Sequence, residues 1–343
     1  MAQFPSSLTT HKSIIGLDLS GTGAPRAWQR SEDTEAESFI MGRLAGLASL
    51  ADRGGVDFLA LDSSFRLGGS WRRDAWLDGA VAASRLSRHT HRATLVATVP
   101  LGVTEPAHVA GAITSVHRAS AERAGWQVEP STASHRSSAR AVDAVISAWS
   151  APTARHRTGP VAGAPERARP LVVVGVRSPL DLELAAARAD IARLTVSTLE
   201  EARLARASIR EAAREWGRRP EDVRVLVDIH TVISGDQRSA QARWELLAAL
   251  EGGPSAGGLR AVGTAADLAT LWHSWVRAGA ADGFTVIPAS VPTDVIALVQ
   301  DVVPELTARG LRSQAPVVVG AQTPAARPAA RRPARARTVA VGA

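Results

Sequence analysis

The feature that most constrains the fold is a regular alternation between short β-type runs and longer stretches with helical spacing. The runs are apolar almost to their ends, as is typical of parallel strands that are buried on both faces. Eight such runs occur, at residues 13–20, 56–63, 93–99, 124–128, 171–176, 190–196, 223–233 and 282–288. This order predicts an α/β protein in which each strand is followed by a helix that packs on a parallel sheet.

Helical spacing fills the segments between the runs. The predicted helices cover residues 34–53, 74–88, 105–122, 137–149, 179–188, 199–216, 237–250, 265–278 and 292–309. Ser178 before Pro179, and Thr198 and Thr264 ahead of acidic residues, are typical helix starts. Eight strands, each followed by a helix, with one further helix before the last strand, predict a (β/α)8 TIM barrel.

One domain and a tail account for the chain. Its 343 residues, 45% of them hydrophobic, are enough for one large core, and no composition shift divides them before residue 313. We therefore expect a single barrel over residues 1–312 and a disordered Ala/Pro/Arg-rich tail over residues 313–343. No apolar run approaches the roughly 18 to 20 residues that span a bilayer, and the first residues lack a secretory layout. We predict a cytoplasmic protein without a membrane partner.

Charge and cysteine content argue against some classes of function. The net charge is +7, but the tail carries five arginines and no acidic residue, at positions 327, 331, 332, 335 and 337. Such a tail predicts at most a weak attraction to polyanions, so we expect no specific nucleic-acid partner. The absence of Cys removes thiolate nucleophiles and sulfur-ligated metals, and His89 and His91 lie in a polar loop away from the expected active face. We predict no metal site.

The chemistry of a (β/α)8 barrel lies at the carboxyl ends of its strands, which selects among the polar residues. Candidates at these ends are Asp18, Ser20, Asp62, Ser63, Thr98, Pro100, Gln127, Glu129, Ser131, Arg177, Ser178, Ser197, Thr198 and His230. In a closed barrel they converge on one mouth. Structural alternatives stay open: Asp62 and Thr198 as helix caps, Asp18 as an acceptor for backbone amides, and His230 as a core histidine with a hydrogen-bond partner.

Several segments resemble the bacterial-luciferase-like flavin-dependent monooxygenases. The similarity is carried by TEPAHVAGAITSVHRASAERAGWQVEPS (104–131), RSPLDLELAAARAD (177–190), AGAADGFTVIP (278–288) and VVPELTARGLR (302–312). LDLSGTGAPRAWQ (17–29) and FLALDS (58–63) are similar to the family's first two strands. The matches keep the family's order, and the branch that this chain most resembles includes the nitrilotriacetate and dibenzothiophene-sulfone monooxygenases.

The resemblance implies a luciferase-like barrel that takes reduced FMN from a separate flavin reductase and oxygenates a small organic substrate with O2. The residues implied at the cofactor are Asp62, Thr98 and Gln127 near the flavin ring, Ser131 as the family's serine, and Arg177 and Ser178 near the phosphate. A helix start suits a phosphate because its free amides and positive dipole end point at the ligand, and Arg177 adds a bidentate partner. The resemblance also implies a cis bond at Val99–Pro100, and it leaves the catalytic residues unknown.

The site also departs from the family's pattern, which keeps other functions open. Glu129 and Pro130 stand where the family has V-T before its serine, and the histidine of the family's first loop is absent. The insertion after the fourth strand is reduced, which predicts a more open mouth. The alternatives are a flavin-site-degenerate barrel that acts as a non-catalytic binding protein, and an F420-dependent oxidoreductase. A homodimer is a further open alternative, although Trp272 and Trp275 are expected in the core.

Overall fold

The computed structural model describes residues 13–20, 36–62, 65–66, 76–101, 104–129, 135–150, 169–251 and 257–312. Within these ranges eight parallel strands form a closed barrel, which confirms the predicted fold. In barrel order they are β1 (Ile14–Asp18), β2 (Phe58–Leu61), β5 (Thr94–Pro100), β6 (Ala124–Glu129), β7 (Leu171–Val176), β8 (Ile191–Leu194), β9 (Arg224–Ile233) and β11 (Gly283–Pro288). The barrel closes because β9 pairs with both β8 and β11, and β11 pairs with β1.

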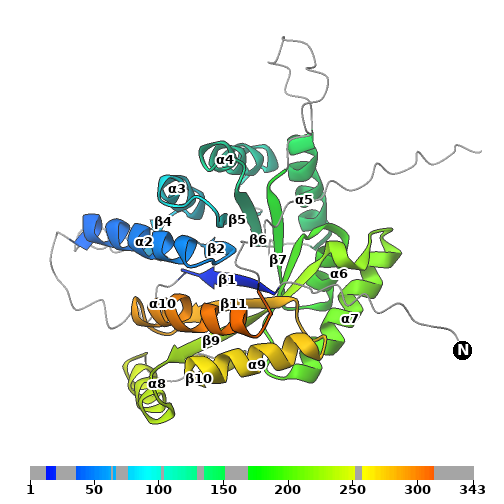
Figure 1. Cartoon of the computed structure of the whole chain (residues 1–343). Helices are drawn as coiled ribbons and strands as arrows, with labels where there is room; N and C mark the ends of the chain where they lie inside the picture. Colours follow the sequence, from blue (N-terminus) through cyan, green and yellow to red (C-terminus); the bar gives the residue numbers. More distant parts are fainter. Residues whose placement is uncertain are drawn as a thin grey trace, which may run out of the picture.

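Helices surround the strands on the outside of the barrel (Figure 1). They are α2 (Ala36–Arg53), α3 (Gly79–Leu86), α4 (Pro106–Ala119), α5 (His135–Ser150), α6 (Pro179–Arg188), α7 (Leu199–Glu215), α8 (Gln237–Glu251) and α9 (Ala265–Arg277). The last helical stretch consists of α10 (Thr293–Ala297), a π-helical turn (Leu298–Val302) and α11 (Val303–Ala308). Each helix expected from the spacing is present, with ends that differ by a few residues.

Three short strands are not predicted by the sequence pattern. β3 (Phe65–Arg66) and β4 (Trp76–Leu77) form an antiparallel ribbon after β2. β10 (Leu259–Gly263) pairs in parallel with the second half of β9, beyond the part of β9 that pairs with β8. The long strand β9 is therefore shared, and β10 continues the barrel wall toward the carboxyl ends of the strands.

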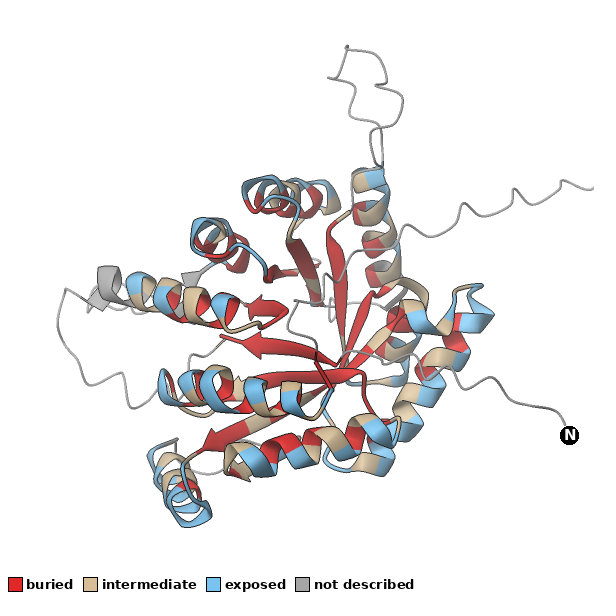
Figure 2. Cartoon of the chain, in the orientation of Figure 1, coloured by how far each residue is buried: buried red, intermediate tan, exposed pale blue. Residues whose placement is uncertain are grey.

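Alternation along the strands separates two sets of side chains, because successive residues of a strand point to opposite faces. The set that faces the barrel axis includes an apolar cluster of Ile14, Phe58, Ala60, Val96, Leu171, Val173, Ile191 and Leu226. The opposite set packs beneath the helices in the main core. Figure 2 shows buried strands, and helices that are buried on the side facing them. The apolar cluster fills the amino-terminal half of the interior, which leaves the carboxyl ends as the side for a ligand.

Three aspartates hold the amino-terminal rim of the barrel in the same way. Asp57, Asp190 and Asp282 stand directly before β2, β8 and β11, and each carboxylate accepts a backbone N–H from a neighbouring strand. Each also pairs with arginine: Arg312 with Asp57 at 2.7 Å, Arg169 with Asp190 at 2.7 Å, and Arg206 with Asp282 at 2.7 Å. The rim is thus closed by buried ion pairs that also satisfy strand amides.

The prediction that Trp272 and Trp275 lie in the core is confirmed. Trp272 is fully buried, its Nε1–H donates to Oγ of Ser13 at 2.6 Å, and its ring centroid lies 4.5 Å from that of Phe284. Trp275 contacts the same phenyl ring, with a centroid distance of 5.8 Å. Both indoles stabilise the packing of α9 on β11 and offer no dimer surface.

Three further expectations concern the insertion after the fourth strand, the tail and membrane-spanning segments. β6 ends at Glu129 and α5 begins at His135, which agrees with the predicted short insertion after the fourth strand. Residues 313–343 lie outside the described residues, so the division of the chain into residues 1–312 and a tail stays a prediction. No helix in the described ranges is long and apolar enough to cross a bilayer.

Candidate active site

A buried arginine joins four strands above the apolar cluster. Arg193 of β8 donates from Nη2 to Oδ2 of Asp18 on β1 at 2.6 Å, and from Nε to Oδ1 of Asp228 on β9 at 2.9 Å. Its Nη1 donates to Oε1 of Gln127 on β6 at 2.7 Å. The side chains of the three charged residues are only 7% to 13% exposed. We call these four residues the arginine layer.

The charges of the arginine layer do not cancel, because one guanidinium faces two carboxylates. Burial raises the pKa of Asp228, and the charge and hydrogen bond of Arg193 oppose this rise. Burial lowers the pKa of Arg193, but Asp228 and Asp18 outweigh burial and raise that pKa above its ordinary value. Arg193 therefore stays charged, and a proton taken up by the layer goes to a carboxylate.

Thr98 and Gln127, both expected at the flavin ring, are brought together. They are neighbours in the register of β5 and β6 and face the barrel axis. Thr98 is buried and Gln127 is half-buried. Because Oε1 of Gln127 accepts from Arg193, the amide nitrogen lies on the side away from the guanidinium and is the end that can donate to a ligand.

Four other candidates at the strand ends, among them Asp62 that is expected near the ring, have different outcomes. Asp62 directly follows β2 and is half-buried at its carboxyl end. Asp18 is both an acceptor for a backbone amide and a member of the arginine layer. Its Oδ1 accepts the backbone N–H of Ser20 at 2.9 Å, and its Oδ2 accepts from the guanidinium of Arg193. Glu129 ends β6 on the same face as Gln127 and is exposed. Ser131 lies outside the described residues, so its role stays a prediction.

The predicted cis bond at Val99–Pro100 is wrong. In the described chain the cis peptide is Val291–Pro292, ahead of α10. Pro100 instead ends β5 in register with Glu129, and an extended strand continues through a trans bond. The carbonyl of Val99 accepts the indole N–H of Trp126 at 3.0 Å, which further orders this end of β5.

Arg177 and Ser178 lead into α6 as expected, but an aspartate of the same helix uses their polar groups. Oδ2 of Asp181 accepts the Ser178 hydroxyl at 2.9 Å and the Arg177 backbone N–H at 3.1 Å. Ser178 also caps the helix, because its Oγ accepts the backbone N–H of Asp181. A carboxylate thus already occupies the positive end of α6, and the exposed side chain of Arg177 is the part available to a phosphate.

His230 and Gly175 mark the interior level above the arginine layer. His230 follows Asp228 by two residues on β9, so it faces the axis nearer the mouth, and it is half-buried. Burial lowers the pKa of His230, with Asp228 opposing and Arg260 adding to this effect. Gly175 lies beside Arg193 in the register of β7 and β8, and a Cβ placed there would meet no atom within 4 Å. The described interior therefore leaves space beside Gly175.

Known proteins resemble this chain in sequence and in fold. Residues 140–297 match the family model described as luciferase-like monooxygenase. N-acetyl-S-(2-succino)cysteine monooxygenase of Bacillus subtilis (strain 168) is 23% identical, over 87% of this chain and 92% of that protein. EDTA monooxygenase from Chelativorans sp. BNC1 has a TM-score of 0.72 at 18% identity, over 88% of this chain and 95% of that one. This chain is therefore similar to the luciferase-like monooxygenases, by the family model over residues 140–297 and by fold over most of its length.

These similarities confirm the resemblance that the sequence motifs indicated, together with an enzyme of the monooxygenase or oxidoreductase class. The luciferase-like fold extends to other redox enzymes. An F420-dependent secondary alcohol dehydrogenase, solved with an F420-acetone adduct, has a TM-score of 0.61 at 13% identity, over 86% of this chain and 99% of that one. The fold alone therefore does not distinguish FMN from F420.

Sequence reasoning missed the two central members of this luciferase-like site, Arg193 and Asp228. Both lie inside the strand runs DIARLTV and VRVLVDIHTVI, whereas the candidates selected from the sequence lie at strand ends. A charged residue in the middle of an apolar run was the available signal, since buried charges are rare unless paired. Among the described residues, no group of three or more His, Cys, Asp or Glu side chains is placed to hold a metal ion.

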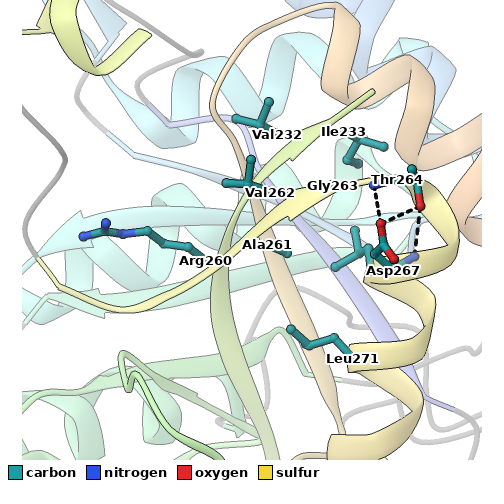
Figure 3. A pocket seen from close by; sticks show the side chains of 10 residues that line it. Val232, Ile233, Arg260, Ala261, Val262, Gly263, Thr264, Asp267 and Leu271 are labelled. Atoms are coloured by element: carbon teal, nitrogen blue, oxygen red, sulfur yellow. Dashed lines mark hydrogen bonds between the residues drawn. The ribbon is translucent and has the colours of Figure 1, made fainter. Parts of the chain in front are cut away.

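A cavity of about 170 Å³ lies outside the luciferase-like barrel, between β10 and α9 (Figure 3). Apolar side chains such as Val232, Val262 and Leu271 line it. Two of its polar side chains, Thr264 and Asp267, hydrogen-bond to each other in the cap of α9. The third, Arg260, lies with its guanidinium carbon 5.3 Å from the ring centroid of Trp244. These groups have partners within the protein, so we assign no ligand to this cavity.

Proposed function

We propose that this chain is a flavin-dependent monooxygenase that binds reduced FMN and uses O2 to oxygenate a small organic substrate. The observation that carries the proposal is the convergence of Thr98, Gln127 and Arg193 inside a luciferase-like barrel. These groups lie toward the carboxyl ends of the strands, where (β/α)8 enzymes bind their ligands. A flavin reductase that supplies the reduced cofactor is part of the same proposal.

The described interior offers side chains whose chemistry suits a flavin ring. The space beside Gly175 is open to an added Cβ, and the amide of Gln127 and the hydroxyl of Thr98 can hydrogen-bond to the polar edge of a ring. When bound, reduced FMN supplies the electrons that activate O2. The chain itself would bind and orient the ring. Arg193 orients the amide of Gln127 on β6, and Asp62 would lie near the ring at the end of β2, on the other side of β5.

The phosphate of FMN is assigned to the start of α6. The exposed guanidinium of Arg177 offers a bidentate partner, and Ser178 orders the first turn of the helix. The carboxylate of Asp181 opposes a second anion there, so Arg177 carries most of the attraction. Ser131 belongs to the same proposal by its position in the family's motif.

A second candidate function is an F420-dependent oxidoreductase. It is favoured by the likeness of fold to the F420-dependent secondary alcohol dehydrogenase. Hydride transfer to or from F420 needs no activation of O2, which also suits the open mouth that the sequence predicts. A barrel without flavin affinity, acting as a binding protein, is the remaining alternative, and the carboxylates of Asp181 and Glu129 near the proposed site favour it.

The proposal is tested by an anaerobic titration of the full chain with photoreduced FMN, followed by tryptophan fluorescence. Oxidised FMN and F420 are titrated in parallel. We expect tightest binding to reduced FMN, and about 10-fold weaker binding by Arg177→Ala, because the lost phosphate contact is worth about 1.4 kcal/mol. The matched control is Arg203→Ala, since Arg203 is an exposed arginine on the outer helix α7.

Three outcomes contradict the proposal or part of it. Tighter binding of F420 than of reduced FMN would favour the oxidoreductase, and no binding of any flavin would favour the binding protein. Equal binding by Arg177→Ala and the unchanged chain would leave the cofactor in place but remove Arg177 from the phosphate site.

A further inference from the structure

His230 occupies a position in the barrel interior that the proposed function leaves unused. Its neighbours in the register are Arg260, at the start of β10, and Ile287, near the carboxyl end of β11. It lies two residues beyond Asp228 on the inward face of β9, so it stands between the arginine layer and the mouth. Its half-buried ring keeps access to that mouth.

The ring of His230 lies against the backbone before β10 but makes no hydrogen bond within the described part of the chain. A Cβ built on Gly258 would lie 3.8 Å from Cδ2 and 4.0 Å from Nε2 of His230, so one edge of the ring lies beside the backbone that precedes β10. Neither ring nitrogen has a hydrogen-bond partner among the described residues. A core histidine normally has such a partner, so the interpretation of His230 as a hydrogen-bonded core residue is not supported.

Burial and the charges around His230 act on its pKa in opposite directions. Asp228 on the same strand and Asp18 on β1 favour the imidazolium, while Arg260 on β10 and burial disfavour it. Arg193 of β8 neutralises much of the two carboxylates, and β11 contributes the uncharged Ile287. Burial prevails and lowers the pKa of His230, so the resting imidazole is neutral and can accept a proton.

Thr98 and the members of the arginine layer are poorly suited to move a proton. Arg193 stays protonated, and the carboxylates of Asp18 and Asp228 are both bound to it. Thr98 and Gln127 do not titrate in the accessible range. His230 is a titratable group above this layer that is not bound to Arg193, and its neutral imidazole can accept a proton and return it.

We propose that His230 transfers a proton at the barrel mouth, acting first as the base and then as the acid of the reaction. This inference rests on the proposed function. There, reduced FMN, O2 and substrate become oxidised FMN, oxygenated product and water, and the two electrons and two hydrogens of the reduced flavin end in that water. One of the two hydrogens leaves as a proton, binds a free ring nitrogen of His230, and passes to the oxygen atom that departs as water.

Two measurements on the full chain test this role. In the first, imidazole resonances are followed by NMR across the pH range, and His230 is assigned by the loss of its signals in His230→Gln. We expect a midpoint below the ordinary pKa of histidine, and an upward shift when reduced FMN is bound, because an anion favours the imidazolium. His108→Gln is the matched control, since His108 is exposed on the outer helix α4.

The second measurement is the rate at which O2 reoxidises reduced FMN bound to the protein, recorded by stopped-flow absorbance across the same pH range. We expect His230→Gln to bind reduced FMN normally, to react about 100-fold more slowly, and to lose the inflection seen in the unchanged chain. Added imidazole should restore part of the rate, which a purely structural residue would not show. His108→Gln should retain both rate and inflection.

The outcomes separate this inference from the proposed function. If reduced FMN binds but His230→Gln reacts at the normal rate with the normal pH profile, only the role of His230 is wrong. If the His230 midpoint does not respond to bound reduced FMN, the ring lies away from the flavin and the inference is also wrong. If the unchanged chain binds no flavin, the proposed function fails first and the inference fails with it.

Discussion

Replacing Arg193 by methionine is expected to destabilise the barrel by an amount that depends on pH. Methionine retains most of the side-chain volume but removes the charge that faces Asp18 and Asp228 at 2.6 and 2.9 Å. At an effective dielectric constant of about 20, each close pair of unit charges contributes about 4 kcal/mol before desolvation is counted. Breaking a buried pair by removing one partner typically costs about 3–5 kcal/mol, which is the loss expected here at about pH 8.

The pH dependence follows from the carboxyl groups that the variant leaves behind. Arg193 normally opposes the raised pKa of Asp228, so its removal raises that pKa further above the unfolded value. A folded state with the higher pKa binds more protons than the unfolded state, so acidification stabilises it by up to about 1.4 kcal/mol per pH unit for each such group. The free energy of unfolding of Arg193→Met should therefore come closer to that of the unchanged chain as the pH falls from about 8 to about 5.5.

The assay is urea unfolding followed by tryptophan fluorescence at several pH values. The double variant Arg193→Met with Asp228→Asn should recover part of the loss at high pH, because one buried charge is removed. Arg203→Met is the matched control, with an expected loss of no more than about 1 kcal/mol because its pair with Glu200 is exposed. A deficit for Arg193→Met that is below about 1 kcal/mol, or constant with pH, would refute the reasoning.

Two further predictions concern the scaffold. Arg312→Met should lower the free energy of unfolding by about 3–5 kcal/mol, because the buried carboxylate of Asp57 loses the guanidinium that pairs with it in the rim. Equilibrium unfolding measures it, and unchanged flavin binding by the folded variant would confine the effect to stability. Thr264→Ala should cost about 1 kcal/mol, because it removes the capping box with Asp267 at the start of α9. A loss in urea unfolding equal to that of Ser274→Ala, whose exposed hydroxyl donates back along the same helix to the carbonyl of Leu271, would contradict this value.

The outcome for Ser178 shows where motif reasoning is ambiguous. The pair Ser178–Pro179 predicts a helix start, and the structure confirms it, with Ser178 as the cap of α6. The same geometry was also interpreted as a phosphate site, because both uses depend on free amides at a helix end. The sequence does not show whether a phosphate or a side chain of the protein accepts these hydrogen bonds. In the structure the acceptor beside Arg177 and Ser178 is the carboxylate of Asp181.

The strand β10 was missed for a related reason. Its residues, LRAVG, are short and only partly apolar, and they follow a glycine-rich stretch, so the local pattern favours a loop. The strand exists because β9 extends beyond β8 and leaves its second half without a partner on that side, which β10 pairs with. This vacancy arises from the closed barrel and not from the residues of β10.

The sequence by itself determined the order of the eight barrel strands and their helices, the barrel, and the resemblance to luciferase-like monooxygenases. Those features depend on periodicity, helix starts and motifs that are local in the chain. Only the tertiary structure decided the chemistry of the mouth. Arg193 meets Asp228, Gln127 and Asp18 across separations of 35, 66 and 175 residues, and no local pattern encodes these contacts. Closing the barrel brings the four strands together, and burial inside it then sets the charge of each group.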